Sequence, residues 1–107
     1  LAEGDIGEHF PPTDPKWKDI SSDIFLQRAI ELMIGKAGEI VNVDLTIICE
    51  LPKIGPFKSK MRQNLSEIFQ TPSKNINIKA TTSEGLGAMG RKEGISSQAT
   101  VTIRLPV

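Results

Sequence analysis

The stretch "IVNVDLTIIC", residues 40–49, determines the expected fold. Apolar residues recur at every second position from Val41 to Cys49, and polar residues occupy positions 42, 44 and 46. Successive side chains of a strand point to opposite faces of a sheet. The alternation therefore predicts a strand with one apolar face and one polar face.

A second helix–strand pair follows this strand. Residues 51–55 form a turn with Pro52 and Gly55, and apolar residues at helical spacing then predict a helix over about 57–69. Ile76, Ile78 and Ala80 mark a short strand at 76–81. Two strands joined by a helix form a right-handed crossover, so we expect these strands to be parallel.

The flanking segments complete the expected architecture. Ser21 or Ser22 can cap a helix over about 22–36, which Gly35 and Gly38 can end. Residues 1–20 contain three prolines, which predict an ordered loop or turns rather than a helix. Residues 82–96 are glycine-rich and predict a loop, and residues 98–105 alternate as a final strand.

We therefore expect a single α+β domain over 1–107, a two-layer arrangement in which helices cover one face of a mixed β-sheet. Three strands are few for a stable sheet covered by two helices. A further strand from upstream of Leu1, or a partner subunit, is expected to complete it.

Charge and hydropathy exclude several classes of protein. Thirteen basic residues balance thirteen acidic ones, which argues against a general nucleic-acid binder. No apolar run approaches the roughly 20 residues of a membrane-spanning helix, and no signal or transit segment is recognisable. Residues 1–31 are rich in acids and residues 53–92 are rich in bases. The acidic part could hold metal ions and the basic part could face phosphates, but from charge alone two differently solvated faces are the favoured interpretation.

The only cysteine, Cys49, lies in the apolar run and is expected to be a buried thiol in a reducing compartment. A catalytic cysteine needs a histidine partner. The only histidine, His9, is far away in the sequence, and we expect it to be an exposed loop residue.

Gly85–Gly90, "GLGAMG", matches the dinucleotide fingerprint G-x-G-x-x-G. That fingerprint requires a following helix and a second strand with an acidic residue about 20 residues on. Only a strand fits into the residues after Gly90, so we reject a dinucleotide site. The loop glycines could still let backbone amides approach an anion.

The residues before these glycines carry more chemistry. Thr81, Thr82 and Ser83 place three hydroxyl groups at a strand end, with Lys79 before them and Glu84 after them. Such groups can position a phosphate and a divalent metal ion. The plainer interpretation, hydroxyls that cap local turns, is favoured by composition alone.

Three stretches in register add a family resemblance: "GDIGEHFPPTDP" (residues 4–15), "NVDLTIICELPKIGP" (42–56) and "NIKATTSEGLGAMGRKEGI" (77–95). Together they resemble 2-C-methyl-D-erythritol 2,4-cyclodiphosphate synthase, of non-mevalonate isoprenoid (terpenoid) biosynthesis, over nearly the whole chain. The resemblance implies a metal-dependent lyase that cyclises 4-diphosphocytidyl-2-C-methyl-D-erythritol 2-phosphate and releases CMP. It further implies a homotrimer with active sites between subunits, Zn²⁺ and Mg²⁺ or Mn²⁺ as cofactors, no nucleic-acid or membrane partner, and a bacterial cytoplasmic or plastid-stroma location.

The resemblance also implies roles for residues of this chain. Thr82 takes the place of the threonine that stabilises the transition state, Glu84 binds the second divalent ion, and Arg91 and Ala88 lie near a phosphate-binding cavity on the three-fold axis. The remaining substrate-binding residues fall into three groups: Asp5, Ile6, Gly7, Phe10, Pro11, Pro12, Thr13 and Asp14 for the methylerythritol and phosphate end; Cys49, Glu50, Leu51, Pro52, Lys53, Ile54 and Gly55 for cytidine, largely through backbone groups; and Ala80, Thr81, Thr82, Ser83 and Glu84 for the diphosphate.

The chain departs from the family pattern in several places. Pro12 replaces an aspartate of some members, and Ala88 replaces a phenylalanine. The family's zinc-binding Asp-x-His pair and later histidine do not occur in these residues, and His9 is not one of them, so we expect those ligands upstream of Leu1. A non-catalytic nucleotide-binding fragment that lacks the zinc site stays open as an alternative, and a small interaction domain is disfavoured by the three motifs.

Overall fold

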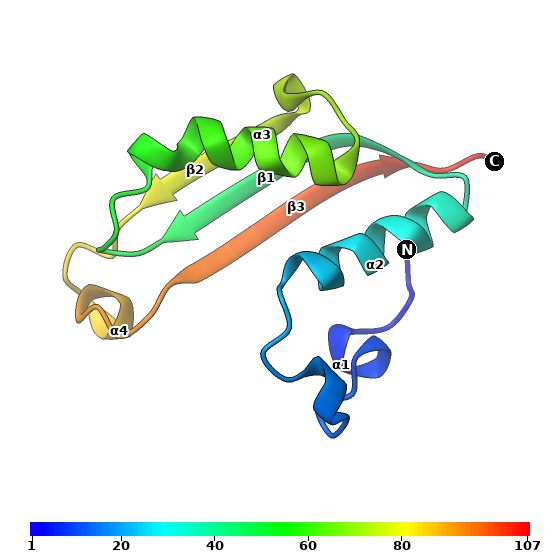
Figure 1. Cartoon of the computed structure of the whole chain (residues 1–107). Helices are drawn as coiled ribbons and strands as arrows, with labels where there is room; N and C mark the ends of the chain where they lie inside the picture. The colour runs from blue at the N-terminus through cyan, green and yellow to red at the C-terminus, as the bar shows by residue number, and fades with distance from the viewer. The chain divides into compact units, whose positions relative to one another are not determined.

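The computed structural model describes all residues from 1 to 107. It contains three strands, four α-helices and three 3₁₀ turns (Figure 1). In chain order these are α1 (Ile6–His9), η1 (Pro15–Trp17), α2 (Asp23–Gly35), β1 (Glu39–Ile48), η2 (Gly55–Phe57), α3 (Lys58–Phe69), η3 (Ser73–Asn75), β2 (Ile76–Thr81), α4 (Gly87–Gly90) and β3 (Ser96–Arg104). They form two compact units, one of Leu1–Glu39 with Arg104–Val107 and one of Ile40–Ile103.

The sheet has the strand order β2-β1-β3. β1 and β2 are parallel, with Val43 opposite Ile76 at one end of the ladder and Ile48 opposite Thr81 at the other. β3 runs in the opposite direction beside β1 (Figure 1). The sheet is therefore mixed, and the predicted α+β class, the parallel pair and the crossover helix between its strands are confirmed.

The apolar face of the parallel pair forms the core of the second unit. Val43 has no exposed surface and Ile76, directly opposite, is 2% exposed. Ile47 and Ile78 are also buried on this face, together with Phe69 at the end of α3. Full burial of one such aliphatic side chain stabilises a fold by about 1.5–3 kcal/mol. The period-two pattern in the sequence therefore identified the buried face correctly.

α3 is tied to the start of β2 by the side chain of Arg62. Its Nε donates to the Ile76 carbonyl at 3.0 Å, and its Nη2 donates to the Ser73 carbonyl at 2.8 Å. The helix ends at Gln70, which has a left-handed backbone with φ of 53°. Ser66 then donates its hydroxyl to the Thr71 carbonyl at 2.6 Å, which closes the turn into β2.

The other face of the parallel pair carries a polar cluster, as the alternation predicted. The Asp44 carboxylate accepts hydrogen bonds from Lys79 Nζ at 2.8 Å and from Asn77 Nδ2 at 3.0 Å. The hydrogen bond from Lys79, and then that from Asn77, hold the pKa of Asp44 below its usual value of 3.8.

The first unit contains a short helix in a segment predicted to have none. Asp5 accepts a hydrogen bond from the Glu8 amide at 3.0 Å and so caps the single turn of α1, and Asp14 caps η1 in the same way. Phe10, which follows α1, contacts Trp17 and Phe25 edge to face at centroid distances of 4.8 and 4.7 Å. The prolines therefore leave room for one helical turn, which aromatic packing holds in place.

Two further predictions for this unit need correction. Ser22 occupies the N-cap position of α2 but makes no side-chain hydrogen bond to the helix. His9 is half-buried rather than exposed, and its Nε2 donates to the Glu3 carbonyl at 2.6 Å.

No helix in either unit has both the length and the apolar composition needed to cross a lipid bilayer.

Candidate active site

The loop that follows β2 has an unusual backbone. Glu84, Gly85 and Gly87 have φ angles of 54°, 80° and 68°, in the left-handed region that glycine adopts most readily. Gly87 begins α4, a single helical turn within the segment predicted to be a loop. The glycine motif thus forms a tight turn and not the long helix of a dinucleotide site.

One carboxylate from the end of β1 holds this loop. Glu50 Oε1 lies 3.2 Å from the Ser83 amide nitrogen, 3.3 Å from the Gly85 amide nitrogen and 3.4 Å from Ser83 Oγ. The amides of Glu84 and Leu86 are also paired, with Thr82 Oγ1 at 3.1 Å and the Ser83 carbonyl at 3.1 Å. The amides of residues 83–86 therefore have partners within the protein and are not free to bind an anion.

Thr82 instead offers its hydroxyl proton. Its Oγ1 accepts from the Glu84 amide, which fixes the direction of the oxygen lone pairs. A hydroxyl group has one proton to donate, and no acceptor within the protein takes the proton of Thr82. The side chain is exposed at the end of β2, so its hydroxyl can donate to an oxygen atom of a ligand.

A pocket of about 350 Å³ lies beside Thr82. The Cys49 amide donates to the Thr81 carbonyl at 3.1 Å, which joins the ends of the two parallel strands. Cys49 is buried as predicted, and its thiol contacts the Pro52 carbonyl at 3.5 Å. The lining residues come from both strand ends: Cys49, Glu50, Pro52, Lys53, Ile54, Gly55, Pro56, Lys58, Ala80, Thr81 and Thr82.

The structure thus brings together most of the residues predicted for cytidine and diphosphate. Leu51 does not line this pocket, although its peptide bond to Pro52 is cis and shapes the turn. Pro56 and Lys58 do line it and were missed by sequence analysis. Lys58 begins α3, and its position directly after the turn was the available signal.

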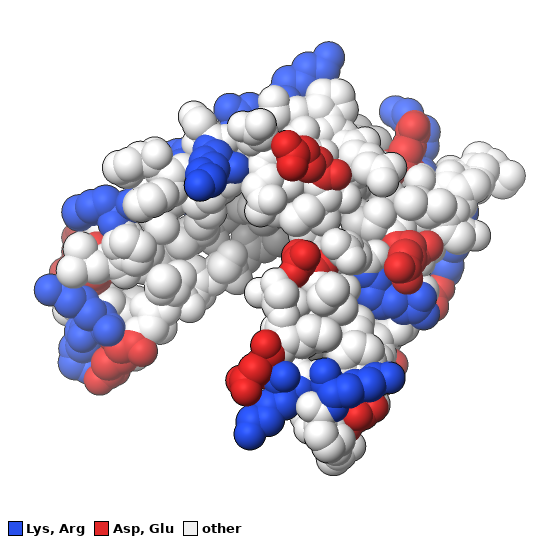
Figure 2. Space-filling view, viewed as in Figure 1, with Lys and Arg blue, Asp and Glu red and all other residues white.

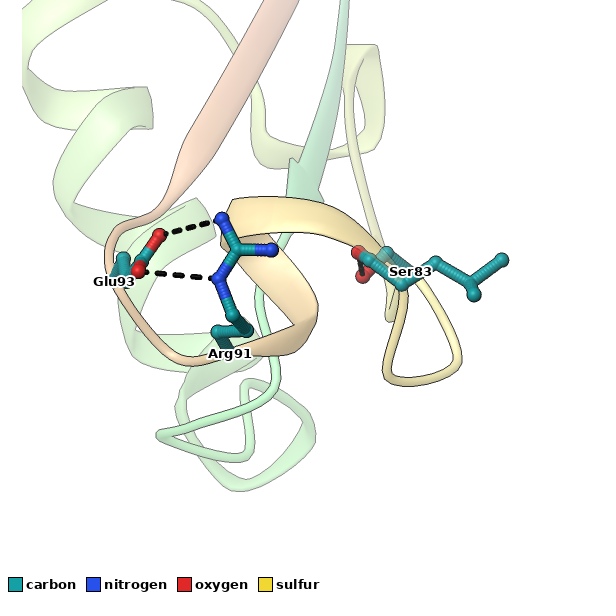
Figure 3. A network of polar contacts seen from close by, with 4 residues as sticks. Ser83, Arg91 and Glu93 are labelled. Carbon is teal, nitrogen blue, oxygen red and sulfur yellow. Dashed lines mark hydrogen bonds and ion pairs between the residues drawn. The ribbon is translucent and has the colours of Figure 1, made fainter.

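The predicted residues near the glycines lie further along the loop. Arg91 donates from Nε and NH2 to the two oxygens of Glu93, both at 3.1 Å (Figure 3). Ala88 lies exposed on α4. Glu93 was not predicted to have a role, and in the structure it is the ion-pair partner of the exposed guanidinium group. Lys and Arg side chains stand over α3 and the α4 loop in the face seen in Figure 2.

The predicted residues of the first unit form a group of their own. Ile6, Gly7, Phe10, Pro12 and Thr13 line an aromatic pocket of about 640 Å³, with Trp17 and Phe25 among its other walls. Asp5 and Asp14 act as helix caps, and Pro11 is exposed beside them. The carboxylates of Asp5 and Asp14 therefore have a structural role as helix caps.

The acidic residues of the chain differ in their fit to metal ions. No three His, Cys, Asp or Glu side chains lie close enough together to hold a metal, so these residues do not make a tetrahedral zinc site. Mg²⁺ is commonly held by one or two carboxylates together with substrate phosphates. The carboxylate of Glu84 is exposed, and the Glu84 amide contacts the Thr82 hydroxyl, so Glu84 fits that requirement.

The pocket lies at the carboxyl ends of two parallel strands of an α+β domain, which is where open sheets of this kind commonly bind ligands. The YgbB family model matches residues 1–104, and the chain belongs to the YgbB family. The family resemblance found in the sequence is confirmed.

The chain is similar to named proteins of this family. It is 54% identical over 106 residues to the bifunctional enzyme IspD/IspF of Rhodopseudomonas palustris, a match that covers 99% of this chain and 27% of that protein. The corresponding protein of Caulobacter vibrioides is 51% identical over 106 residues, with 99% and 28% covered. The chain spans about a quarter of the length of these curated relatives.

Solved structures share the fold. IspF of Plasmodium falciparum in a CDP complex superimposes with a TM-score of 0.81 at 32% identity, covering 96% of this chain and 60% of that one. The bifunctional IspDF of Campylobacter jejuni gives a TM-score of 0.87 at 36% identity, covering 95% and 28%. The chain thus has the fold of these IspF structures.

Proposed function

We propose that the protein containing this chain converts 4-diphosphocytidyl-2-C-methyl-D-erythritol 2-phosphate into 2-C-methyl-D-erythritol 2,4-cyclodiphosphate and CMP. The observation that carries the proposal is the pocket of Cys49–Gly55 and Ala80–Thr82, in a chain 32% identical to an IspF solved with CDP. A cytidine diphosphate group contains the base, ribose and diphosphate that such a pocket and loop would receive.

The reaction needs no nucleophile from the protein. An oxygen of the substrate's 2-phosphate attacks its β-phosphorus, and the bond from that phosphorus to the oxygen of CMP breaks. The protein's task is to hold the two phosphates in line and to stabilise the charge that develops. A divalent ion would supply charge neutralisation at these phosphates.

The residues of this chain would divide that task. The backbone of residues 49–55 would hold the cytosine and ribose, and Lys53 and Lys58 would stand near the phosphates. The Thr82 hydroxyl would donate to the diphosphate in the transition state. Its oxygen already accepts from the Glu84 amide, and its proton has no acceptor within the protein. Glu84 would hold the Mg²⁺ or Mn²⁺ ion, whereas a Zn²⁺ ion would find no ligand set among these residues.

The proposal includes an assembly and a location. Residues 5–14 would contact the methylerythritol end from a neighbouring subunit of a homotrimer, and Arg91 with Ala88 would lie near its axis. The enzyme would act as a lyase in the bacterial cytoplasm, or in a plastid stroma. The relatives named above are bacterial, which supports the first of these.

Turnover by the full protein tests the proposal. CMP release and the cyclic product would be followed by ³¹P NMR with Mg²⁺ present, for the unaltered protein and for Thr82→Ala. We expect kcat to fall by about 100-fold or more on loss of a transition-state hydrogen bond of this kind. Ser59→Ala, an exposed hydroxyl on α3, is the matched control. CDP binding without any turnover by the unaltered protein would indicate a nucleotide-binding module instead.

A further inference from the structure

The side chain of Glu50 links two parts of the candidate site that are distant in the sequence. Glu50 belongs to the pocket-lining segment after β1, and its carboxylate meets amides 33 and 35 residues further on, at Ser83 and Gly85. Its backbone was expected to contact cytidine. The structure gives its side chain a different task.

The contacts to Glu50 differ in strength. Ser83 Oγ lies 3.4 Å from Glu50 Oε1 but 2.7 Å from the Leu86 carbonyl oxygen. A hydroxyl group has a single proton, so it goes to the nearer Leu86 oxygen. The two backbone amides have no such alternative. The Ser83 and Gly85 amides therefore make the main hydrogen bonds to Glu50, both to the same carboxylate oxygen. Hydrogen bonds to a charged acceptor are stronger than those between neutral groups.

These two amides lie on either side of Glu84. Glu84 has a left-handed backbone with φ of 54°, an angle that costs free energy for a residue with a side chain. Its own amide is bonded to Thr82 Oγ1. Anchoring residues 83 and 85 therefore holds the backbone of Glu84, from which its carboxylate projects, and through the Glu84 amide it also orients the Thr82 hydroxyl.

We propose that Glu50 is a positioning residue: its carboxylate fixes the Thr82–Gly85 loop, so that the nucleoside pocket and the phosphate-handling groups are held in one geometry. The expected effect of Glu50 on kcat rests on the proposed function, whereas its anchoring of the loop does not. Glu50 touches no reacting atom in this scheme. Its effect is exerted through Thr82 and Glu84.

Two substitutions separate positioning from general stability. Glu50→Ala removes the acceptor and leaves two amides unpaired, whereas Glu50→Gln keeps an acceptor oxygen and loses only the charge. Glu67→Ala, which removes an exposed carboxylate on the outer side of α3, is the control for net charge. All are made in the full-length protein, and thermal unfolding confirms that each variant is folded.

The structural readout is amide hydrogen exchange followed by NMR. We expect exchange at Ser83 and Gly85 to accelerate by about tenfold or more in Glu50→Ala, since bonds to charged groups have such an effect. Exchange should accelerate less in Glu50→Gln, which keeps a neutral acceptor, and should stay near the original rate in Glu67→Ala. Unchanged exchange in Glu50→Ala would overturn the proposal, whether or not the protein proves to be a synthase.

The kinetic readout is the division between kcat and KM. We expect Glu50→Ala to lower kcat by about tenfold or more while KM changes little, and Glu50→Gln to recover most of that loss. A rise in KM with kcat unchanged would show that Glu50 binds substrate directly and would overturn the positioning role. If the unaltered protein has no turnover while exchange responds as expected, the proposed function fails and the anchoring of the loop by Glu50 stands.

Discussion

Gly90 packs directly against the backbone of Gly85: a Cβ atom built on Gly90 would lie 2.1 Å from the Gly85 carbonyl carbon. Real Cβ atoms do not approach a carbon so closely, and backbone atoms cannot move aside as a flexible side chain can. The last glycine of the G-x-G-x-x-G pattern therefore has no side chain because its Cα packs against the backbone of the first. They close the turn that presents Thr82 and Glu84.

The first prediction follows from this contact. Gly90→Ala should destabilise the protein by about 1–3 kcal/mol, the usual cost of forcing an added methyl group into a packed position. It should also lower turnover, because the loop must shift. Urea unfolding monitored by circular dichroism measures the first effect, and Gly35→Ala is the matched control, since no atom lies within 4 Å of a Cβ there. Equal stability of the two variants would contradict the packing.

The second prediction concerns Arg62, which joins α3 to the start of β2. Arg62→Met should lower the free energy of unfolding by about 1–3 kcal/mol, because two bonds from a charged donor to the carbonyls of Ser73 and Ile76 are lost. Lys60→Met, an exposed neighbour on α3, should change it by less than about 0.5 kcal/mol. A loss in the control as large as that in Arg62→Met would assign the effect to charge rather than to these bonds.

The third prediction is the pH dependence of the polar cluster on the sheet. The pKa of Asp44 is lowered in the folded state, chiefly by the hydrogen bond from Lys79, so ionised Asp44 favours folding. Its contribution should be fully present well above pH 3.8 and disappear as the pH falls through 3.8 to the lowered pKa. Unfolding curves of Asp44→Asn and the unaltered protein should therefore differ at pH 7 and converge below that window. A difference that persists at the lowest pH would contradict this origin.

The parts of the fold that were predictable depend on local patterns. The alternation around Val43 identified β1 and its buried face, and helical spacing placed α3 within one residue of its observed start at Lys58. α1 was missed because the prolines of residues 1–20 argued against a helix, although Asp5 and Glu8 have the spacing of a helix start. The contacts of Phe10 with Trp17 and Phe25, in contrast, follow no local pattern.

The candidate site divides in the same way. The hydroxyl groups of residues 81–83 and the turn after β1 could be recognised from the sequence. The Glu50 contacts to Ser83 and Gly85 could not, because they span more than 30 residues and depend on the parallel pairing of β1 and β2. The left-handed backbone at Glu84 was equally unpredictable, since glycine and asparagine are the residues that usually adopt it.

The fourth prediction concerns the metal ion proposed at Glu84. Glu84→Gln keeps the shape of the side chain and removes its charge, so it should raise the Mg²⁺ concentration needed for half-maximal turnover by about tenfold, as expected for loss of one charged ligand of a hard cation. Saturating Mg²⁺ should restore much of kcat, whereas it should not rescue Thr82→Ala, whose missing hydroxyl donates a hydrogen bond and is not a ligand. Titration of Mn²⁺ by electron paramagnetic resonance, with CDP bound, measures the same change without turnover. Glu67→Gln is the control for charge. Equal Mg²⁺ and Mn²⁺ dependence in Glu84→Gln and in the control would show that the ion is held by other groups.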